Sequence, residues 1–402
     1  KDRNVAIAPN GAMFKRDKQG FLPELMEKMY TERVVYKKKA IEAKKEFQKT
    51  KDPIYSNEIS RCHNIQMAKK ISLNSAYGAI GNQYFRYFDV KQAEAITLGG
   101  QLSIRWVERD VNRFMNKLLG TDNKNYVVAS DTDSIYLKLD TLVEKVCKGK
   151  STKQIVEFLN KAAEDKIQKV IDDSYQNLAH YVNAYQQKMI MKREAIANKG
   201  IWVAKKRYMM NVFDEEGVQY DIPKLKIMGV EAVKSSTPEV CRGKIKDAIR
   251  VIMNDSEDAL IKFVNDFKEV FKTLSPEEVA FPRSCNNVNR YVDSNSIYKK
   301  GTPIHVKGAL IYNHHINKHR LSAKYPIIKD GDKIKFLMLK QPNTVKDTVI
   351  SFSTKIPYEF DLHKYVDYDT QFEKTFTDPL KFILDSIGWK LEREATLEAF
   401  FG

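Results

Sequence analysis

Hydrophobic residues recur at intervals of three and four from Phe21 to Lys51, where Asp52-Pro53 interrupts the pattern. Residues at this spacing share one face of a helix, so the pattern predicts a long amphipathic helix that ends before the proline. A second helix is predicted from about Asn57 to Ala79. Because only a short loop separates the two, we expect them to form an antiparallel helical hairpin.

Three later stretches have the same helical periodicity, and a fourth stretch lacks it. Amphipathic helices are predicted within residues 83–120, 153–191 and 239–275. Residues 276–370 mix turn signals with short apolar runs and predict an irregular segment. The segment Glu392–Ala399 again has helical character.

Alternating, β-prone runs between these helices predict two hairpins. The first joins Tyr126–Ala129 to Ile135–Leu139 through a five-residue polar turn, and the second joins Trp202–Tyr208 to Met209–Phe213. Long helices combined with a few short strands predict an α+β fold.

The turn of the first hairpin carries two carboxylates, Asp131 and Asp133, separated by one residue. In extended backbone such residues point to the same side, and paired carboxylate oxygens suit a hard divalent cation that also holds phosphates. Aspartate is also common in turns, because its side chain caps nearby backbone N–H groups. The spacing alone leaves both a metal site and a capped turn open.

The chain of 402 residues has 68 basic and 52 acidic side chains, which gives a net charge of +16. Its length allows two or three domains, and a hydrophobic content of 43% indicates a globular protein rather than a disordered one. A positive field favours phosphate-bearing partners, nucleic acid above all. A basic soluble protein without such a partner would have the same composition.

The four cysteines, Cys62, Cys147, Cys241 and Cys285, lie far apart and form no Cys-x-x-Cys pair. They are typical of reduced, packed thiols rather than of a disulfide or zinc framework. Three histidines gather within Leu310–His319, but no cysteine or acidic cluster accompanies them, which argues against zinc. No apolar run approaches the roughly 18 residues that a membrane span needs, so we expect no membrane contact.

Cations gather on one face of the predicted helical hairpin. Arg33 and Lys37 are four residues apart and share a face of the first helix. One face of the second helix combines a cation, an amide, an aromatic ring and a bare backbone, from Lys70, Asn74, Tyr77 and Gly78. A glycine inside a helix costs about 1 kcal/mol relative to alanine, so ordinary packing explains this face poorly. The cations could form a phosphate clamp, although chance lysines on a basic helix would look the same.

Two further segments suggest contacts with partners. The run Lys205-Lys206-Arg207-Tyr208 combines cations with a ring, which suits the phosphates and base planes of nucleic acid. The sequence closes with the apolar segment Leu397–Phe401. An apolar terminus frays unless it docks, so we expect this tail to anchor in a groove of a partner or to fold back on its own domain.

Four motifs, which occur along the chain in the order expected for the family, resemble those of family B DNA polymerases. The resemblance is strongest to the T-even-type bacteriophage branch. Ser130–Ser134 is similar to motif C of the palm, and Lys70–Gly78 is similar to motif B of the fingers. Lys205–Tyr208 is similar to the element that holds the primer terminus, and Lys224–Gly229 with Lys234–Pro238 is similar to the palm–thumb junction. The resemblance covers essentially the whole chain and corresponds to the C-terminal half of the family's proteins.

The resemblance implies a right-hand architecture with a mixed or antiparallel palm sheet, a two-helix fingers hairpin and a helical plus irregular thumb. The palm would comprise residues 1–20 and 83–229, and the fingers 21–82. The thumb with a clamp-binding tail would comprise 230–402, with the histidines of 310–319 against duplex DNA.

Roles for individual residues follow from the same resemblance. Asp131 and Asp133 would be the catalytic residues that hold two divalent cations, Mg²⁺ or alternatively Mn²⁺. The set that binds the deoxynucleotide triphosphate would be Arg33, Lys37, Lys70, Asn74 and Tyr77. The set that contacts primer–template DNA would be Gly78, Lys205, Lys206 and Tyr208. The set that binds a sliding clamp would be Leu397, Phe400 and Phe401.

One motif of the family does not occur in this sequence. Family members carry a further catalytic aspartate within Asp-x-x-Ser-Leu-Tyr-Pro, and neither this segment nor the exonuclease signatures are found here. We therefore expect efficient primer extension only with an N-terminal half that supplies both, whether the polymerase is naturally divided or the chain is a fragment. The palm sheet should then expose an edge or a face where the missing strand belongs.

Three functions remain open at this point. The leading hypothesis is a DNA-directed DNA polymerase that transfers a nucleotide from a dNTP to the primer 3′-hydroxyl, in the cytoplasm of an infected bacterial host. The second is a non-catalytic module that binds DNA and docks on a sliding clamp. The third is a metal-dependent nuclease, which would leave the cation face without a purpose. Dependence on a deoxynucleotide triphosphate distinguishes the first from the others.

Overall fold

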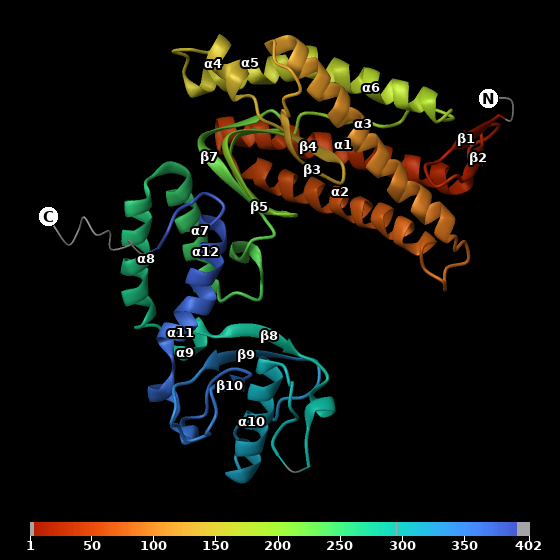
Figure 1. The fold of residues 1–402 in the computed structure, drawn as a ribbon. Coiled ribbons are helices and arrows are strands. Elements are labelled where there is room, and N and C mark those ends of the chain that lie inside the picture. The colour runs from red at the N-terminus through yellow and green to blue at the C-terminus, as the bar shows by residue number, and fades with distance from the viewer. Residues whose placement is uncertain (1–3, 295, 392–402) are drawn as a thin grey trace. The chain divides into compact units, whose positions relative to one another are not determined.

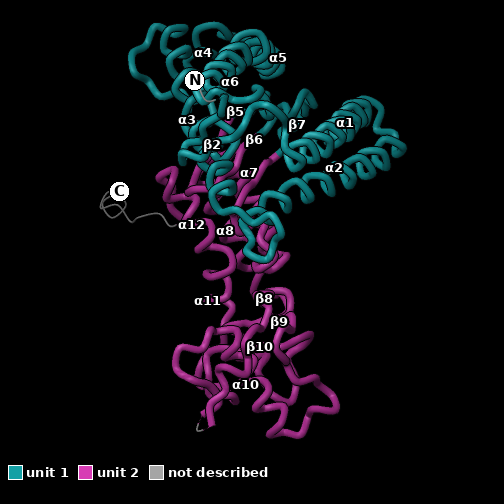
Figure 2. The backbone as a smooth tube through the Cα atoms, turned by 90° about the vertical axis from the view of Figure 1, so that its right-hand side faces the viewer, with its two compact units in different colours: residues 1–198, 212–224 teal, residues 199–211, 225–402 magenta. Residues whose placement is uncertain are grey.

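The computed structural model describes residues 4–294 and 296–391 and divides into two compact units. Unit 1 comprises the chain up to Asn198 together with Val212–Lys224, and unit 2 comprises Lys199–Asn211 and the chain from Leu225 onward (Figure 2). Long helices accompany small two- and three-stranded sheets. The combination confirms the predicted α+β fold.

The first two helices form the predicted hairpin and lie side by side (Figure 1). Helix α1 spans Phe21–Thr50 and helix α2 spans Pro53–Ile80. The second helix begins earlier than the predicted Asn57, because Asp52 accepts a hydrogen bond from the Ile54 N–H at 2.9 Å and Pro53 occupies the first turn. An aspartate cap followed by proline is a strong start signal for a helix.

Small side chains allow α1 and α2 to approach each other. Ala40 and Ala43 of α1 and Cys62 of α2 are buried, whereas most other positions of the pair remain accessible to solvent. An ion pair between Glu32 and Lys69 joins the two helices. This contact sets their register, because it places residue 32 of α1 level with residue 69 of α2.

Helix α3, Val90–Leu119, supports the first predicted hairpin. Strand β3, Val127–Asp131, pairs antiparallel with strand β4, Ser134–Leu137. The side-chain oxygen of Asn112 on α3 accepts hydrogen bonds from the N–H groups of Tyr126 at 2.8 Å and Val127 at 3.1 Å. The core beneath the hairpin contains Val107, Val111, Met115, Tyr126, Val127, Leu142, Ile167, Ile171 and Tyr175.

Three helices follow this hairpin: α4, Asp140–Val146; α5, Thr152–Ala162; and α6, Gln168–Tyr181, with a π-helical turn at Ala163–Ile167. The prediction of helix up to residue 191 was wrong at its end. Asn183 adopts a positive φ of 52°, and its side chain donates to the carbonyl of Val5 at 2.8 Å. A left-handed residue stops a helix, so the chain leaves α6 there.

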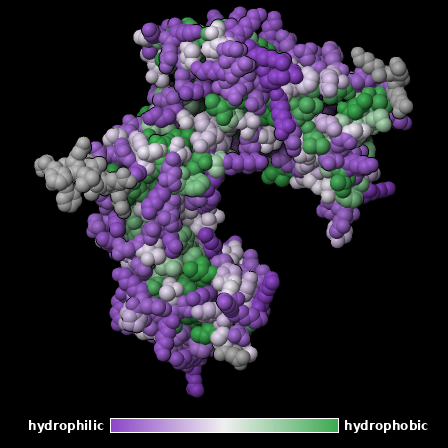
Figure 3. Space-filling view, viewed as in Figure 1, coloured by the Kyte–Doolittle hydropathy of each residue, from purple (hydrophilic) through white to green (hydrophobic). Residues whose placement is uncertain are grey.

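A small hairpin near the start of the chain packs beside α3 and α6. Strand β1, Val5–Ile7, pairs antiparallel with strand β2, Met13–Lys15. The Ile7 N–H donates to the carbonyl of Val182 at 3.0 Å. Ile7 and Met13 are more than half exposed, and Figure 3 shows hydrophobic surface over this hairpin.

Three long strands form a sheet with the order β5-β6-β7. They span Ala195–Ala204, Arg207–Glu215 and Val218–Met228. A hairpin therefore occurs in the predicted region, but the prediction was wrong about its turn, because Tyr208 lies in β6 together with Met209–Phe213. The connections are two-residue turns, at Lys205–Lys206 and Glu216–Gly217. The boundary between the two units passes through the residues of this sheet.

Unit 2 opens with the helices predicted within residues 239–275: α7, Glu239–Asn254, and α8, Glu257–Phe271. Helices α9, Pro276–Val279, α11, Tyr368–Phe372, and α12, Asp378–Leu384, complete this part, with a π-helical turn at Glu373–Thr377. Its core is rich in phenylalanine, and the rings of Phe267 and Phe376 are 4.7 Å apart. Short 3-10 turns occur at Glu231–Val233, Val288–Tyr291, Tyr358–Phe360 and His363–Tyr365.

The segment predicted to be irregular contains a further antiparallel sheet of three strands. Strands β8, Phe281–Cys285, β9, Asp332–Met338, and β10, Val349–Phe352, pair in the order β10-β9-β8. Helix α10, Ile304–Lys318, packs closely on this sheet at Gly308, where an added Cβ would lie 2.5 Å from the Ser351 hydroxyl oxygen. The strands are short and far apart in sequence, which explains why the local pattern did not reveal them.

In the described ranges, no helix combines the length and the apolar composition needed to cross a membrane. The predicted helix Glu392–Ala399 and the candidate clamp-binding residues Leu397, Phe400 and Phe401 lie outside the described residues.

One histidine of residues 310–319 is buried on the inner side of helix α10. His315 is 8% exposed, and its ring is 5.7 Å from that of Phe360. Burial lowers the pKa of His315 to about 4, with smaller contributions from the neighbouring His314 and Lys318. The imidazole is therefore held neutral in the folded chain.

We predict that unit 2 loses stability as the pH falls from 6.5 towards 4. The unfolded chain binds a proton at His315 near pH 6.5, whereas the folded chain does not until about pH 4, so acid favours unfolding. The loss should be about 2 kcal/mol between pH 7.5 and pH 5, measured by urea denaturation. His315→Phe should remove most of this difference, while His363→Asn, a half-buried control, should retain it.

Candidate active site

The candidate carboxylates lie at the tip of the β3–β4 hairpin. Asp131 pairs with Ser134, so the turn consists of only Thr132 and Asp133 rather than of five residues as predicted. Thr132 adopts a positive φ of 55°, and the Asp133 N–H donates to the Asp131 carbonyl at 2.6 Å. This tight turn fixes the backbone that carries the two aspartates.

Neither aspartate has a cationic partner among the described residues. Asp131 is half-buried and accepts a hydrogen bond from the Thr132 hydroxyl at 3.0 Å, and Asp133 is exposed. Two adjacent carboxylates without compensating cations fit the oxygen ligands that a hard divalent ion takes. Within the described residues, no group of three or more His, Cys, Asp or Glu side chains is placed to hold a metal ion. The hairpin therefore supplies two candidate ligands, the carboxylates of Asp131 and Asp133.

A buried tyrosine behind the hairpin was missed by the sequence reasoning. Tyr175 of α6 is 4% exposed, and burial followed by the negative charge of Asp133 raises the pKa of its phenol. Asp133 is thus close enough to Tyr175 for its charge to act there. The spacing Ile167, Ile171, Tyr175 along one face of the helix was the available signal.

The cation face of α1 and α2 is only partly neutralised. Arg33 is half-buried, and neither an acceptor for its Nε–H nor an ion pair occurs in the described part of the chain. Lys70 is exposed, and it too has no carboxylate partner within those ranges. From the Glu32–Lys69 register and a rise of 1.5 Å per residue, Arg33 lies about 3 Å and Lys37 about 9 Å from Lys70 along the helix axis. Along the helix axis, Lys70 is therefore nearer to Arg33 than to Lys37.

Lys37 has a partner that the sequence did not reveal. It forms an ion pair with Glu216 in the β6–β7 turn, within the same unit. The following Gly217 has a φ of 82°, and an added Cβ there would lie 3.1 Å from the ammonium of Lys45. The turn thus packs on α1. A partly exposed ion pair contributes about 0–1 kcal/mol, so an anionic ligand could displace Glu216 easily.

The other residues of the α2 face are accessible. Tyr77 is 43% exposed, and its hydroxyl forms a hydrogen bond of 2.7 Å with the Thr97 hydroxyl of α3. No described atom comes within 4 Å of an ideal Cβ at Gly78, and Asn74 is exposed. The glycine is therefore not explained by packing within the described chain.

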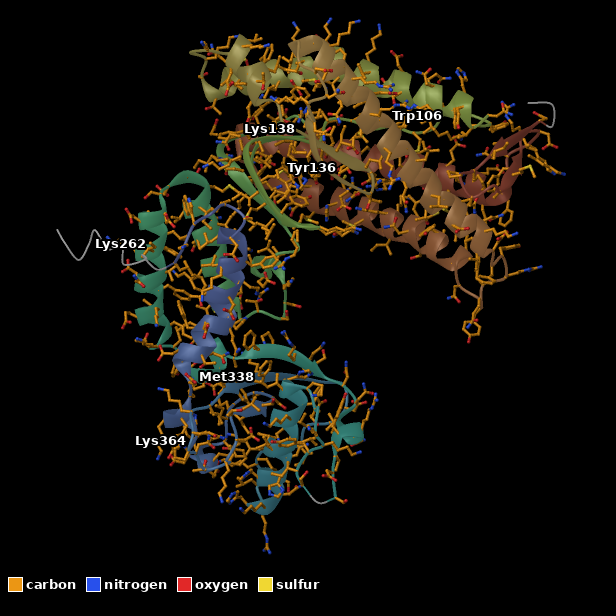
Figure 4. The ribbon with its side chains drawn as sticks, viewed as in Figure 1. Trp106, Tyr136, Lys138, Lys262, Met338 and Lys364 are labelled. Carbon is orange, nitrogen blue, oxygen red and sulfur yellow. The ribbon has the colours of Figure 1, made fainter. Side chains whose placement is uncertain are left out.

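Helix α3 contacts both candidate surfaces. Thr97 near its start bonds Tyr77, and Asn112 near its end bonds the backbone that enters the hairpin. Figure 4 marks Trp106 on the helix between these two points and Tyr136 on β4. The carboxylate tip and the cation face thus belong to one unit and share one support.

The candidate primer-contacting residues belong to unit 2. Lys205 and Lys206 are exposed in the β5–β6 turn, with Lys206 at a φ of 61°. Tyr208 is 7% exposed, and its ring stacks on Trp202 at 6.1 Å. Gly229 fixes this turn, because an added Cβ would lie 2.1 Å from the Lys206 carbonyl oxygen. The turn presents its two lysines, whereas the tyrosine is largely covered.

A comparison with protein families decides the classification. Residues 1–387 match the profile of DNA polymerase family B.

The chain belongs to this family.

Individual relatives agree with this assignment. The chain is 32% identical to the DNA-directed DNA polymerase of Enterobacteria phage T4, over 99% of this chain and 50% of that protein. It is also 32% identical to the corresponding enzyme of Escherichia phage RB69, over 98% of this chain and 50% of that protein. The chain therefore spans about half the length of these relatives.

A solved structure has the same fold. The family B DNA polymerase from Pyrobaculum calidifontis superposes with a TM-score of 0.52 at 19% sequence identity. The match covers 96% of this chain and 41% of that polymerase. At this identity the likeness concerns the fold alone.

We predict that Gly229→Ala displaces the Lys205–Lys206 turn and destabilises unit 2. Alanine would combine a disfavoured positive φ of 66° with a clash against the Lys206 carbonyl. Gly388→Ala is the control, since Gly388 has a φ of 74° and open space around its Cβ position. The control should lose about 1–2 kcal/mol in urea denaturation, and Gly229→Ala should lose clearly more. Equal losses would mean that the close approach at Gly229 is easily relieved.

Proposed function

We propose that this chain is the part of a family B DNA polymerase that binds the incoming deoxynucleotide and holds catalytic metal ions through Asp131 and Asp133. The observation that carries the proposal is a pair of carboxylates without cationic partners in the same unit as a half-neutralised cation face. Nucleotide transfer needs both: oxygen ligands for metal ions and cations for a triphosphate. Family membership supports the assignment.

Arg33 provides the strongest argument for a triphosphate. A half-buried guanidinium without a carboxylate partner is unfavourable unless an anion binds it. Arginine suits phosphate because its planar fork donates two parallel hydrogen bonds. Lys70 lies nearly level with Arg33, and Lys37 would exchange Glu216 for a phosphate oxygen. Asn74 would orient the same end of the nucleotide.

Tyr77 and Gly78 would form the surface on which the new base pair rests. The tyrosine ring is fixed through its hydroxyl to Thr97, and the glycine beside it leaves the backbone bare. A flat surface of this kind tests the shape of a base pair without reading its sequence. Any side chain at position 78 would stand in that space.

Asp131 and Asp133 would bind the divalent cations, Mg²⁺ in the first instance, through their carboxylate oxygens. When bound, such ions activate the primer 3′-hydroxyl and neutralise charge on the leaving pyrophosphate. The chain's own contribution is to fix both carboxylates on a two-residue turn that α3 holds through Asn112. Tyr175 closes the site from behind with a neutral, buried ring.

In this proposal, residues 21–82 are the fingers, residues 1–20 and 83–229 form the palm, and the remainder forms the thumb. Lys205, Lys206 and Tyr208 contact the primer end, and the tail with Leu397, Phe400 and Phe401 binds a sliding clamp. The other half of the polymerase, corresponding to the part of the relatives that this chain does not span, supplies a further catalytic aspartate and the exonuclease. Both strands of the β3–β4 sheet have a free edge in the described chain, which suits the addition of a strand. The enzyme would act in the cytoplasm of an infected bacterial host.

Primer extension tests this proposal. The chain is mixed with primer–template DNA, Mg²⁺ and four deoxynucleotides, alone and with a polypeptide that corresponds to the other half. We expect extension in the mixture and a loss of about a hundredfold or more in Asp133→Asn. Asp122→Asn, an exposed carboxylate outside the hairpin, should extend normally. Full activity of Asp133→Asn would remove the metal assignment.

The same assay separates the second candidate function. A chain that binds primer–template DNA but never extends it, in any mixture, would be a non-catalytic module that binds DNA and docks on a clamp.

We predict opposite effects of Gly78→Ala on stability and on activity. Alanine relieves the entropic penalty of glycine in a helix, so the free energy of unfolding should rise by about 0.5–1 kcal/mol. Incorporation should nevertheless fall, because the methyl group enters the space for the base pair. Gly243→Ala in α7, which also meets no neighbour, should stabilise without slowing incorporation. Unchanged single-nucleotide incorporation by Gly78→Ala would contradict this role.

A further inference from the structure

An apolar surface lies uncovered at one end of unit 1, where the β1–β2 hairpin, the start of α1 and the end of α6 meet (Figure 1). Its large side chains are each about half exposed or more, and we call them together the apolar face: Ile7, Met13, Phe21, Leu25, Tyr181, Tyr185, Met189 and Ile190. A contiguous group of this kind on a folded chain marks a surface that another molecule covers.

Contacts join the three segments into one surface. The Ile7 N–H donates to the Val182 carbonyl at 3.0 Å, which fixes the hairpin to the end of α6. Lys188 forms an ion pair with Glu27, which fixes the segment after α6 to the first turns of α1. The apolar face is therefore held in place before any partner binds, so little ordering would be needed on association.

The composition of the face favours protein over nucleic acid. Residues 181–190 contain a single charged side chain, Lys188, and Glu27 neutralises it. Nucleic acid binds mainly through cations that face its phosphates, and this segment offers none that is unpaired. The centre of a protein interface has the opposite composition, because charged residues are scarce there and tyrosine and methionine are enriched.

A charged cleft borders the apolar face. The Tyr181 ring lies 5.2 Å from the Trp106 ring, and the Arg109 guanidinium lies 4.3 Å from the centre of that ring (Figure 4). Trp106, Arg109 and Arg113 line a cleft of about 370 Å³ between α3 and α6. The Arg113 side chain lies 3.7 Å from Asp110 and is largely exposed, so a carboxylate of a partner can also reach it. An apolar centre with tryptophan and arginine at its border is the usual arrangement of a protein interface.

We propose that the apolar face is the docking surface for the other half of the polymerase. This inference rests on the proposed function. The chain spans 50% of each of the two phage relatives, so a polypeptide for the remaining length is of comparable size. Permanent assemblies of such parts use large interfaces that are more hydrophobic than transient ones. The partner would bring apolar side chains to the centre of the face and carboxylates to Arg109 and Arg113.

Association of the two purified halves tests the inference without requiring catalysis. The probe is the polypeptide that corresponds to the other half, and isothermal titration calorimetry gives its affinity for this chain. Ile190→Asp and Met13→Asp, on two different segments of the face, should each weaken association at least about thirtyfold, because a charge would be buried among apolar groups.

Ile54→Asp is the matched control. Ile54 of α2 is 67% exposed, against 63% for Ile190, and lies outside the apolar face. This variant should associate like the unchanged chain. All three substituted side chains are exposed in the chain alone, so their midpoints of urea denaturation should agree closely, which shows that the variants are folded.

Primer extension by the mixture separates docking from chemistry. Ile190→Asp should require a higher concentration of the other half but reach the same maximal rate, whereas Asp133→Asn should associate normally and extend poorly. If the complex forms through the apolar face and no mixture extends a primer, the proposed function fails and the docking surface stands.

Three results would overturn the docking surface. One is association that neither Ile190→Asp nor Met13→Asp weakens, which would leave the proposed function intact. Another is the absence of a complex between the unchanged halves. The third is self-association of this chain that Ile190→Asp abolishes while binding of the other half persists, which would assign the face to a second copy.

Discussion

The candidate site depends on helix α3, because that helix contacts both of its charged surfaces. The Asn112 side chain accepts two backbone hydrogen bonds at the entry to the carboxylate hairpin, and Thr97 bonds Tyr77 beside the cation face. The buried residues Val107, Val111 and Met115 anchor the helix in the core of unit 1. A substrate that must meet metal ligands and cations simultaneously needs such a common support.

Charge compensation separates structural from functional groups in this chain. The buried Asp214 is paired with Arg193, and Lys69 is paired with Glu32, so these charges stabilise the fold. Asp131, Asp133 and Arg33 have no such partners within the described residues. A partly buried charge without a partner lowers the stability of the folded chain. A ligand of opposite charge removes this penalty when it binds, which favours binding at that position.

The same contrast applies to glycine and aromatic residues. Gly229 and Gly308 are required by close backbone or side-chain approaches, whereas Gly78 meets nothing in the described chain. Tyr175 and Tyr208 are buried, whereas Tyr181 is exposed at the end of α6. Residues whose presence the packing does not explain point to contacts with a partner.

Elements with local signals could be predicted from the amino-acid sequence. Helical periodicity and the Asp52-Pro53 break predicted α1 and α2, and the residue pattern placed Asp131 and Asp133 at the tip of a hairpin. Features that depend on distant residues became visible in the folded chain. The sheet of unit 2 pairs β8 with β9 across the whole of α10, Lys37 meets Glu216, and Tyr175 lies near Asp133. Each joins residues too far apart for periodicity or spacing to detect, since such contacts form only when the chain folds back on itself.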